Sequence, residues 1–162
     1  MRSALAIIAV IAATAPAAAE ARRTAPAVWA TVNVCDTLTR PNEMGIRGSM
    51  PGLPRSSRMY MRFRVQYLDG AGAWRTLRSG RLSDSRWQRV ATGRRGEHDS
   101  GWSFEFRPPE SGGAHVLRGL VSFEWRRGGR VVQRTRAFTE AGHPGTAGAE
   151  PEAFSAAMCE IA

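Results

Sequence analysis

Polar and apolar residues alternate along several segments of the chain, and wherever the period is clear it is two rather than 3.6. In residues 58–68, the odd positions from Met59 to Tyr67 are apolar or aromatic, and most even positions are polar. A period of two places one set of side chains on a buried face of a sheet and the other on its exposed face. We therefore predict a half-buried strand over 58–68, a turn at 69–72 and a returning strand over 74–78.

A second long alternation covers residues 117–126, followed by a turn at 127–130 and a returning strand over 131–138. The turn reads Arg-Gly-Gly-Arg, a composition typical of a hairpin. The side chains predicted to face inward are Leu117, Gly119, Val121, Phe123 and Trp125 on the first strand, and Val131, Gln133, Thr135 and Ala137 on the second.

Shorter strands are predicted over 28–35, 44–50, 86–92, 101–107 and 154–161. The segment 101–107 places Trp102, Phe104 and Phe106 on its inner side, and it ends at two prolines, which cannot donate to a sheet ladder. The segment 154–161 could also form a helical turn; we assign it to a strand.

About seven to eight short strands, separated by glycine and proline and without a convincing amphipathic helix, indicate an all-β fold. We predict antiparallel sheets packed as a sandwich, with a small barrel as the alternative.

The N-terminal residues have the three parts of a signal peptide. Arg2 is followed by an uncharged run over 4–15 and by three alanines at 17–19. We predict a signal peptide over 1–19, a flexible segment over 20–27 and one sandwich domain over 28–162. The apolar run is too short to span a bilayer comfortably, so we expect a secreted protein without a transmembrane segment.

The chain has two cysteines, Cys35 and Cys159, near the two ends of the predicted domain. In an oxidising compartment two cysteines most simply pair, so we predict a disulfide that links the terminal segments. Two free buried thiols or a reactive cysteine are the alternatives.

The formal net charge is +9, and all basic residues are arginine. A basic surface favours an anionic partner, such as a cell-wall polymer, an anionic membrane or an envelope protein. The absence of lysine and the abundance of alanine and glycine indicate a high-GC genome, in which arginine is partly the default surface cation. The charge alone therefore does not identify a ligand, and nucleic acid is not the expected partner.

If the strand containing Phe63 and the hairpin containing Phe123 lie in one sheet, their polar positions share an outer face. Guanidinium groups on such a face could bind carboxylate or phosphate. The alternative is a solvated face whose arginines pair with Glu105 and Glu124. The arginines predicted on this face are Arg62, Arg64, Arg118, Arg126, Arg134 and Arg136, with Tyr60, Val132 and Phe138 between them.

The five tryptophans raise the possibility of carbohydrate stacking. Trp102 and Trp125 fall on inward positions, so we assign them to the core. Trp87, which lies in a weak strand between Arg86 and Arg89, is the best candidate for an exposed aromatic contact.

Motifs for catalysis are sparse. His98-Asp99-Ser100 places three catalytic residue types side by side, but neighbours on an extended loop point in different directions. His143 lies in a glycine-proline turn, and such a histidine usually serves as a hydrogen-bonding group. The histidine and cysteine spacings match no metal motif, and the glycine segments match no nucleotide-binding pattern. We therefore expect no catalytic residues, metal or cofactor.

Several segments, including Asn42–Gly45, Ser49–Gly52 and Phe154–Cys159, resemble secreted actinobacterial proteins of uncharacterised function that have an immunoglobulin-like β-sandwich. The resemblance implies the architecture and transfers no activity. It departs from antibody domains because the cysteines lie on the first and last segments. Together, these observations predict a secreted, non-catalytic immunoglobulin-like module that binds a partner at the cell envelope. A small extracellular hydrolase using His98 or His143 and a purely structural envelope protein are the alternatives.

Overall fold

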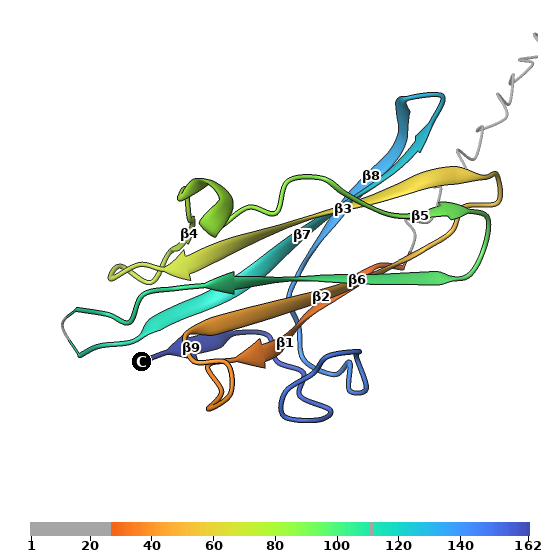
Figure 1. Ribbon diagram of the computed structural model, residues 1–162. Coiled ribbons are helices and arrows are strands. Elements are labelled where there is room, and N and C mark those ends of the chain that lie inside the picture. Colours follow the sequence, from red (N-terminus) through yellow and green to blue (C-terminus); the bar gives the residue numbers. More distant parts are fainter. Residues whose placement is uncertain (1–26, 111) are drawn as a thin grey trace, which may run out of the picture.

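The computed structural model describes residues 27–110 and 112–162 (Figure 1). The predicted signal peptide over 1–19, and the predicted flexible segment over 20–27 apart from Ala27, lie outside the described residues. Within the described part of the chain, no helix is long and apolar enough to cross a membrane.

The smaller of two sheets contains the strands β1 (Trp29–Cys35), β2 (Glu43–Pro51) and β6 (Glu97–Glu105). They lie in the order β1-β2-β6, and both pairings are antiparallel. β2 therefore occupies the centre of this sheet, and β6 is an edge strand.

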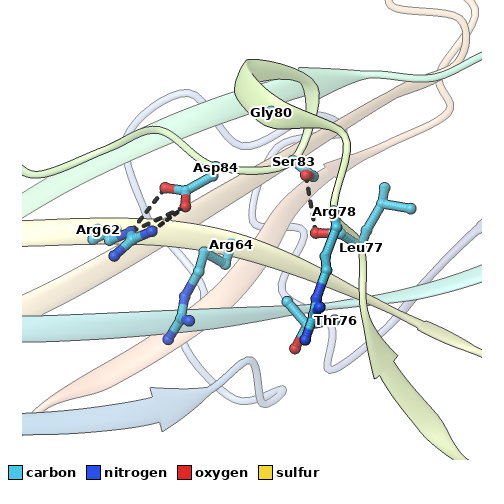
Figure 2. Close-up of a pocket in the computed structure, with 8 residues that line it drawn as sticks. All are labelled: Arg62, Arg64, Thr76, Leu77, Arg78, Gly80, Ser83 and Asp84. Carbon is cyan, nitrogen blue, oxygen red and sulfur yellow. Dashed lines mark hydrogen bonds and ion pairs between the residues drawn. The ribbon is translucent and has the colours of Figure 1, made fainter.

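The larger sheet is built on two long central strands, β3 (Ser57–Leu68) and β7 (His115–Arg127), which pair antiparallel over most of their length. Two short strands, β4 (Trp74–Thr76) and β5 (Gln88–Gly93), pair with opposite ends of β3. A short 3₁₀ helix (Gly80–Leu82) lies in the connection between them, beside β3 (Figure 2).

The other long edge of β7 is divided in the same way. β8 (Arg130–Phe138) pairs with one end of β7, and β9 (Cys159–Ile161) pairs with the other. The described residues thus form an all-β fold with antiparallel sheets, as predicted. The described residues contain nine strands, against the overall expectation of about seven to eight, and each overlaps one of the nine segments assigned to strands from the sequence. Two of the nine are only three residues long.

The inner faces of the two sheets enclose one hydrophobic core. Phe63 on β3 and Phe123 and Trp125 on β7 are fully buried, as are Met44 and Ile46 on β2. The alternation of the long strands produces this arrangement, because every second side chain of β3 from Ser57 to Val65 is buried. Apolar burial on this scale is the main stabilising contribution to the fold.

Gly119 on β7 allows a close approach between the two sheets. A Cβ atom at this position would lie 2.8 Å from Ile46 Cδ1 and 2.6 Å from Thr139 Cγ2. The backbone N–H of Gly119 donates to the Thr139 hydroxyl at 2.9 Å, and this hydroxyl donates to the carbonyl of Ala157 at 2.6 Å. Because Gly119 has no side chain, Thr139 can pack against β7 and form the hydrogen bonds that connect Gly119 with Ala157 near the end of the chain.

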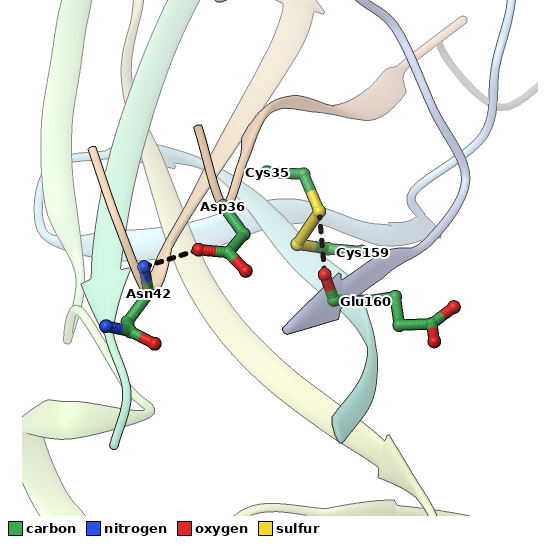
Figure 3. The surroundings of a disulfide bond; sticks show 5 residues. All are labelled: Cys35, Asp36, Asn42, Cys159 and Glu160. Carbon is green, nitrogen blue, oxygen red and sulfur yellow. Dashed lines mark hydrogen bonds between the residues drawn. A yellow bond between two sulfur atoms is a disulfide. The ribbon is translucent and has the colours of Figure 1, made fainter. Parts of the chain in front are cut away.

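Cys35 and Cys159 form the predicted disulfide, with Cα atoms 5.4 Å apart (Figure 3). Cys35 ends β1 in the smaller sheet, and Cys159 begins β9 in the larger sheet. The bond therefore links the two sheets as well as the two ends of the described domain.

Three side chains predicted to face inward are more exposed than expected. Trp102 shares the inner face with Ile46, its partner in the register, but 39% of its surface is exposed, whereas Phe104 on the same strand is 2% exposed. Assigning Trp102 to the core was therefore wrong. Tyr67 is 38% exposed because it lies near the end of β3. Val131 is 44% exposed because the pairing of β7 with β8 shifts between Trp125 and Arg126, which places Val131 opposite Arg126 instead of opposite an inward-facing residue.

Two predicted boundaries also differ. β6 starts at Glu97 and ends at Glu105, so residues 98–100 belong to a strand rather than to a loop. The cause is the pairing with β2, in which Met50 is the register partner of His98. In the predicted final strand over 154–161, only Cys159–Ile161 forms a strand, and Ala156 makes an isolated bridge to Val32.

Candidate functional site: the basic face of the larger sheet

Three strands of the larger sheet bring six arginines onto its outer face. Arg62 and Arg64 come from β3, Arg118 and Arg126 from β7, and Arg134 and Arg136 from β8. They alternate with side chains that face the core. The register keeps this alternation in phase across β3, β7 and β8 as far as Trp125, beyond which the pairing of β7 with β8 shifts by one residue. We call these six residues the basic face.

Glu124, on the same face, neutralises part of this charge. Only 1% of its side chain is exposed, and its two carboxylate oxygens accept hydrogen bonds from Arg126 Nε and Arg134 Nε, each at 2.7 Å. The Arg126 guanidinium also stacks over the ring of Tyr60, 4.1 Å from its centroid. These contacts restrain both arginines, in agreement with the pairing that the sequence suggested for Glu124.

Arg62 is held by Asp84, which lies in the connection between β4 and β5. Arg62 Nε donates to both carboxylate oxygens, at 2.9 and 3.1 Å. This hydrogen bonding holds the pKa of Asp84 below its ordinary value and raises the pKa of Arg62. The sequence pattern did not indicate Asp84, because the segment around Asp84 has no alternation of polar and apolar residues. This segment reaches β3 only through an isolated bridge between Asp84 and Arg64.

Arg118 is sandwiched between two aromatic rings. Its guanidinium lies 4.3 Å from the ring centroid of Trp74 and 4.1 Å from that of Phe138, and its Nε donates to Gln66 Oε1 at 2.9 Å. Burial in this position lowers the pKa of Arg118. Cation–π contact thus fixes one end of the basic face.

Arg64 occupies a different environment. Its Nη2 donates to Ser122 Oγ at 3.2 Å, whereas its buried Nε has no hydrogen-bond partner within the described part of the chain. Burial lowers the pKa of Arg64, and the charges of Arg62 and Arg136 act in the same direction, although Asp84 opposes them. Among residues 27–110 and 112–162, no carboxylate lies within ion-pair distance of Arg64 or Arg136. These two charges are not neutralised by a direct ion pair.

Two of the hollows on this face are lined by both Arg62 and Arg64. The first has a volume of about 400 Å³ and lies below the 3₁₀ helix. Figure 2 shows the Arg62 guanidinium turned toward Asp84, whereas Arg64 points away from that carboxylate. The second hollow, of about 460 Å³, is lined by Arg62, Arg64, Trp87, Ser122, Arg134, Thr135 and Arg136.

Two further expectations concern this region. Trp87 lies at the second hollow but is half-buried, and the Arg126 guanidinium is 5.4 Å from its ring centroid. Glu105, the other expected partner of the arginines, belongs to β6 in the smaller sheet. The prediction that Glu105 pairs with arginines of the basic face is therefore wrong, because Glu105 and the basic face belong to different sheets.

The histidines lie elsewhere. His98 Nε2 is 3.3 Å from the carbonyl oxygen of Arg95, and His143 Nε2 is 3.1 Å from Glu140 Oε1. The His143 ring stacks on Trp29, with the ring centroids 4.3 Å apart. Neither hollow described above is lined by a histidine. In the described residues, no group of three or more histidine, cysteine, aspartate or glutamate side chains could hold a metal ion.

Acid should weaken the contact between Arg62 and Asp84. Because folding lowers the pKa of Asp84, this carboxylate contributes stability above its unfolded pKa, and the contribution disappears as the pH falls through the folded pKa. We expect Asp84→Asn to lower the free energy of unfolding by up to about 1 kcal/mol at pH 7, since the pair is partly exposed. The difference from the wild type should shrink below about pH 4.

Urea unfolding at pH 7, 5, 3 and 2 measures this difference. Asp99→Asn, which changes an exposed carboxylate on β6, is the control and should retain the pH dependence of the wild type. A destabilisation by Asp84→Asn that does not change with pH would contradict the role of the ion pair.

Comparison with known proteins does not assign this site. No protein-family model matches the chain, and no curated protein matches it in sequence.

Proposed function

We propose that this protein is a secreted, non-catalytic binding module of the cell envelope, and that its basic face binds an anionic polymer. The observation that carries the proposal is the environment of Arg64 and Arg136. They share a hollow, and no carboxylate of the described residues lies within ion-pair distance of either. Guanidinium groups suit such a polymer because they contact carboxylate or phosphate through paired donors.

The proposal includes an immunoglobulin-like sandwich. It is supported by two antiparallel sheets that enclose one core and by a disulfide that joins them. The cysteines lie on β1 and β9, whereas antibody domains link two central strands. The disulfide is compatible with an oxidising, extracytoplasmic compartment, in line with the predicted signal peptide.

Removing the two unneutralised charges should weaken polymer binding. We expect the double variant Arg64→Gln/Arg136→Gln to elute from heparin and teichoic-acid columns at lower NaCl concentration than the wild type, with affinity reduced about tenfold or more. The matched control, Arg55→Gln/Arg107→Gln, removes the same charge from exposed positions outside the strands and should retain most of the affinity. Equal losses in the two double variants would indicate non-specific attraction to net charge.

The substitution Glu124→Gln should have the opposite effect on polymer binding. Loss of the buried carboxylate charge releases Arg126 and Arg134, so polymer retention should increase while stability decreases by about 1–3 kcal/mol. If the wild type and this variant both fail to bind any anionic polymer, the result would favour the purely structural alternative.

A further inference from the structure

One short side chain, that of Ser122, lines the second hollow. The register pairs Ser122 with Arg62 on β3 and with Arg136 on β8, so the three residues form one row across the sheet. Adjacent strands are about 4.8 Å apart, which places the two arginine backbones roughly 10 Å apart, on either side of the serine. The long side chains of Arg62 and Arg136 flank the short side chain of Ser122, and this difference in length accounts for the hollow.

Four arginines line this hollow, but their charges are not equivalent. Arg62 is paired with Asp84, and Arg134 is paired with Glu124. Arg64 and Arg136 have no carboxylate within ion-pair distance in the described residues. Arginine stays protonated in proteins, so the hollow carries two positive charges that an ion pair does not balance. A free phosphate or sulfate dianion would balance both charges, and a phosphodiester or sulfate ester of a polymer would balance one of them.

The hydrogen-bond donors approach from three strands. Ser122 Oγ accepts from Arg64 Nη2, which leaves the hydroxyl hydrogen free to donate, and this side chain is nine-tenths buried. A planar carboxylate is best bound by a single guanidinium fork, whereas a tetrahedral oxyanion presents oxygens in several directions. The donors around Ser122 therefore suit a tetrahedral group better.

We propose that this hollow is a binding site for one phosphate or sulfate group, held by Arg64 and Arg136 with the Ser122 hydroxyl. The inference rests on the proposed function, because it names the group that the basic face recognises within its anionic partner. The hollow of about 460 Å³ leaves room for the molecule that carries the group, and Trp87 borders that space.

Calorimetric titration with inorganic phosphate, sulfate and acetate at constant ionic strength tests the site. We expect one phosphate or sulfate per chain, bound more tightly than acetate and with a raised Tm. Arg136→Gln should weaken phosphate binding about tenfold, and Ser122→Ala about three- to tenfold. Arg130→Gln, on the same strand but outside the hollow, is the matched control and should bind as the wild type does.

Equal binding of acetate and phosphate would overturn the inference, as would equal losses in Arg130→Gln and Arg136→Gln. Circular dichroism establishes that each variant is folded before titration. Displacement from a teichoic-acid column by phosphate, or from heparin by sulfate, distinguishes phosphate from sulfate as the group carried by the polymer.

The experiments distinguish failure of the phosphate or sulfate site from failure of the proposed polymer binding. Polymer retention that depends on Arg64 and Arg136, without binding of a small oxyanion, would overturn the discrete site and leave the proposed function standing. Binding of phosphate or sulfate without retention of any anionic polymer would support the discrete site and overturn the proposed function.

Discussion

Replacing Cys35 and Cys159 together by alanine is expected to lower the free energy of unfolding by about 4–5 kcal/mol. The disulfide closes a loop across a sequence separation of 124 residues, and constraining so long a loop removes much of the conformational entropy of the unfolded chain. It also joins β1 of the smaller sheet to β9 of the larger one. Urea unfolding of the oxidised wild type and the double variant measures the difference.

Reduction of the wild type provides the matched control, because it breaks the bond without changing the sequence. The reduced protein and the double alanine variant should have similar stability. A loss below about 1 kcal/mol would show that other contacts suffice to hold the ends together. The main candidates are the two backbone hydrogen bonds between Val32 and Ala156, at 2.9 and 3.0 Å.

The elements predicted well from sequence are those with one strongly apolar face. β3 and β7 alternate over a long stretch, so their inward and outward sides could be read without knowledge of their partners. The hairpin between β7 and β8 was also predictable, because Gly128 and Gly129 adopt the positive φ that the turn requires. From these strands alone, the sequence already placed six arginines on one outer face.

Edge strands were harder to predict, because their environment depends on residues distant in sequence. Trp102 has the expected inward parity but remains 39% exposed, whereas Phe104, two residues further along the same edge strand and on the same side, is 2% exposed. The strand pairing of His98 depends on β2 rather than on the polar sequence around it. Alternation reports which side of a strand faces inward, but not how fully that side is covered.

The composition of the candidate site was only partly predictable for the same reason. The arginines could be placed by parity, whereas the residues that neutralise or orient them lie on other elements. Asp84 reaches Arg62 from an irregular connection, and Trp74 reaches Arg118 from a three-residue strand. Tertiary contacts therefore decide which charges of the basic face remain without an ion pair.

Trp125→Ala is expected to destabilise the protein by about 3–5 kcal/mol. Trp125 is among the largest fully buried side chains, and it packs into the core directly behind the basic face. Its indole N–H also donates to the carbonyl of Pro51 at 2.8 Å, which connects β7 to the end of β2 in the other sheet. The substitution therefore removes a large apolar volume and a contact between the sheets.

Two substitutions separate these contributions in urea unfolding measurements. Trp125→Phe retains most of the apolar volume but leaves the Pro51 carbonyl without its donor, so a smaller loss of about 1–3 kcal/mol is expected. Trp102→Ala removes the same side chain from a position that is 39% exposed, and it should cost less than Trp125→Ala because the cavity term is smaller. Equal losses at the two tryptophans would contradict the assignment of Trp125 to the core, since burial is the property that distinguishes them.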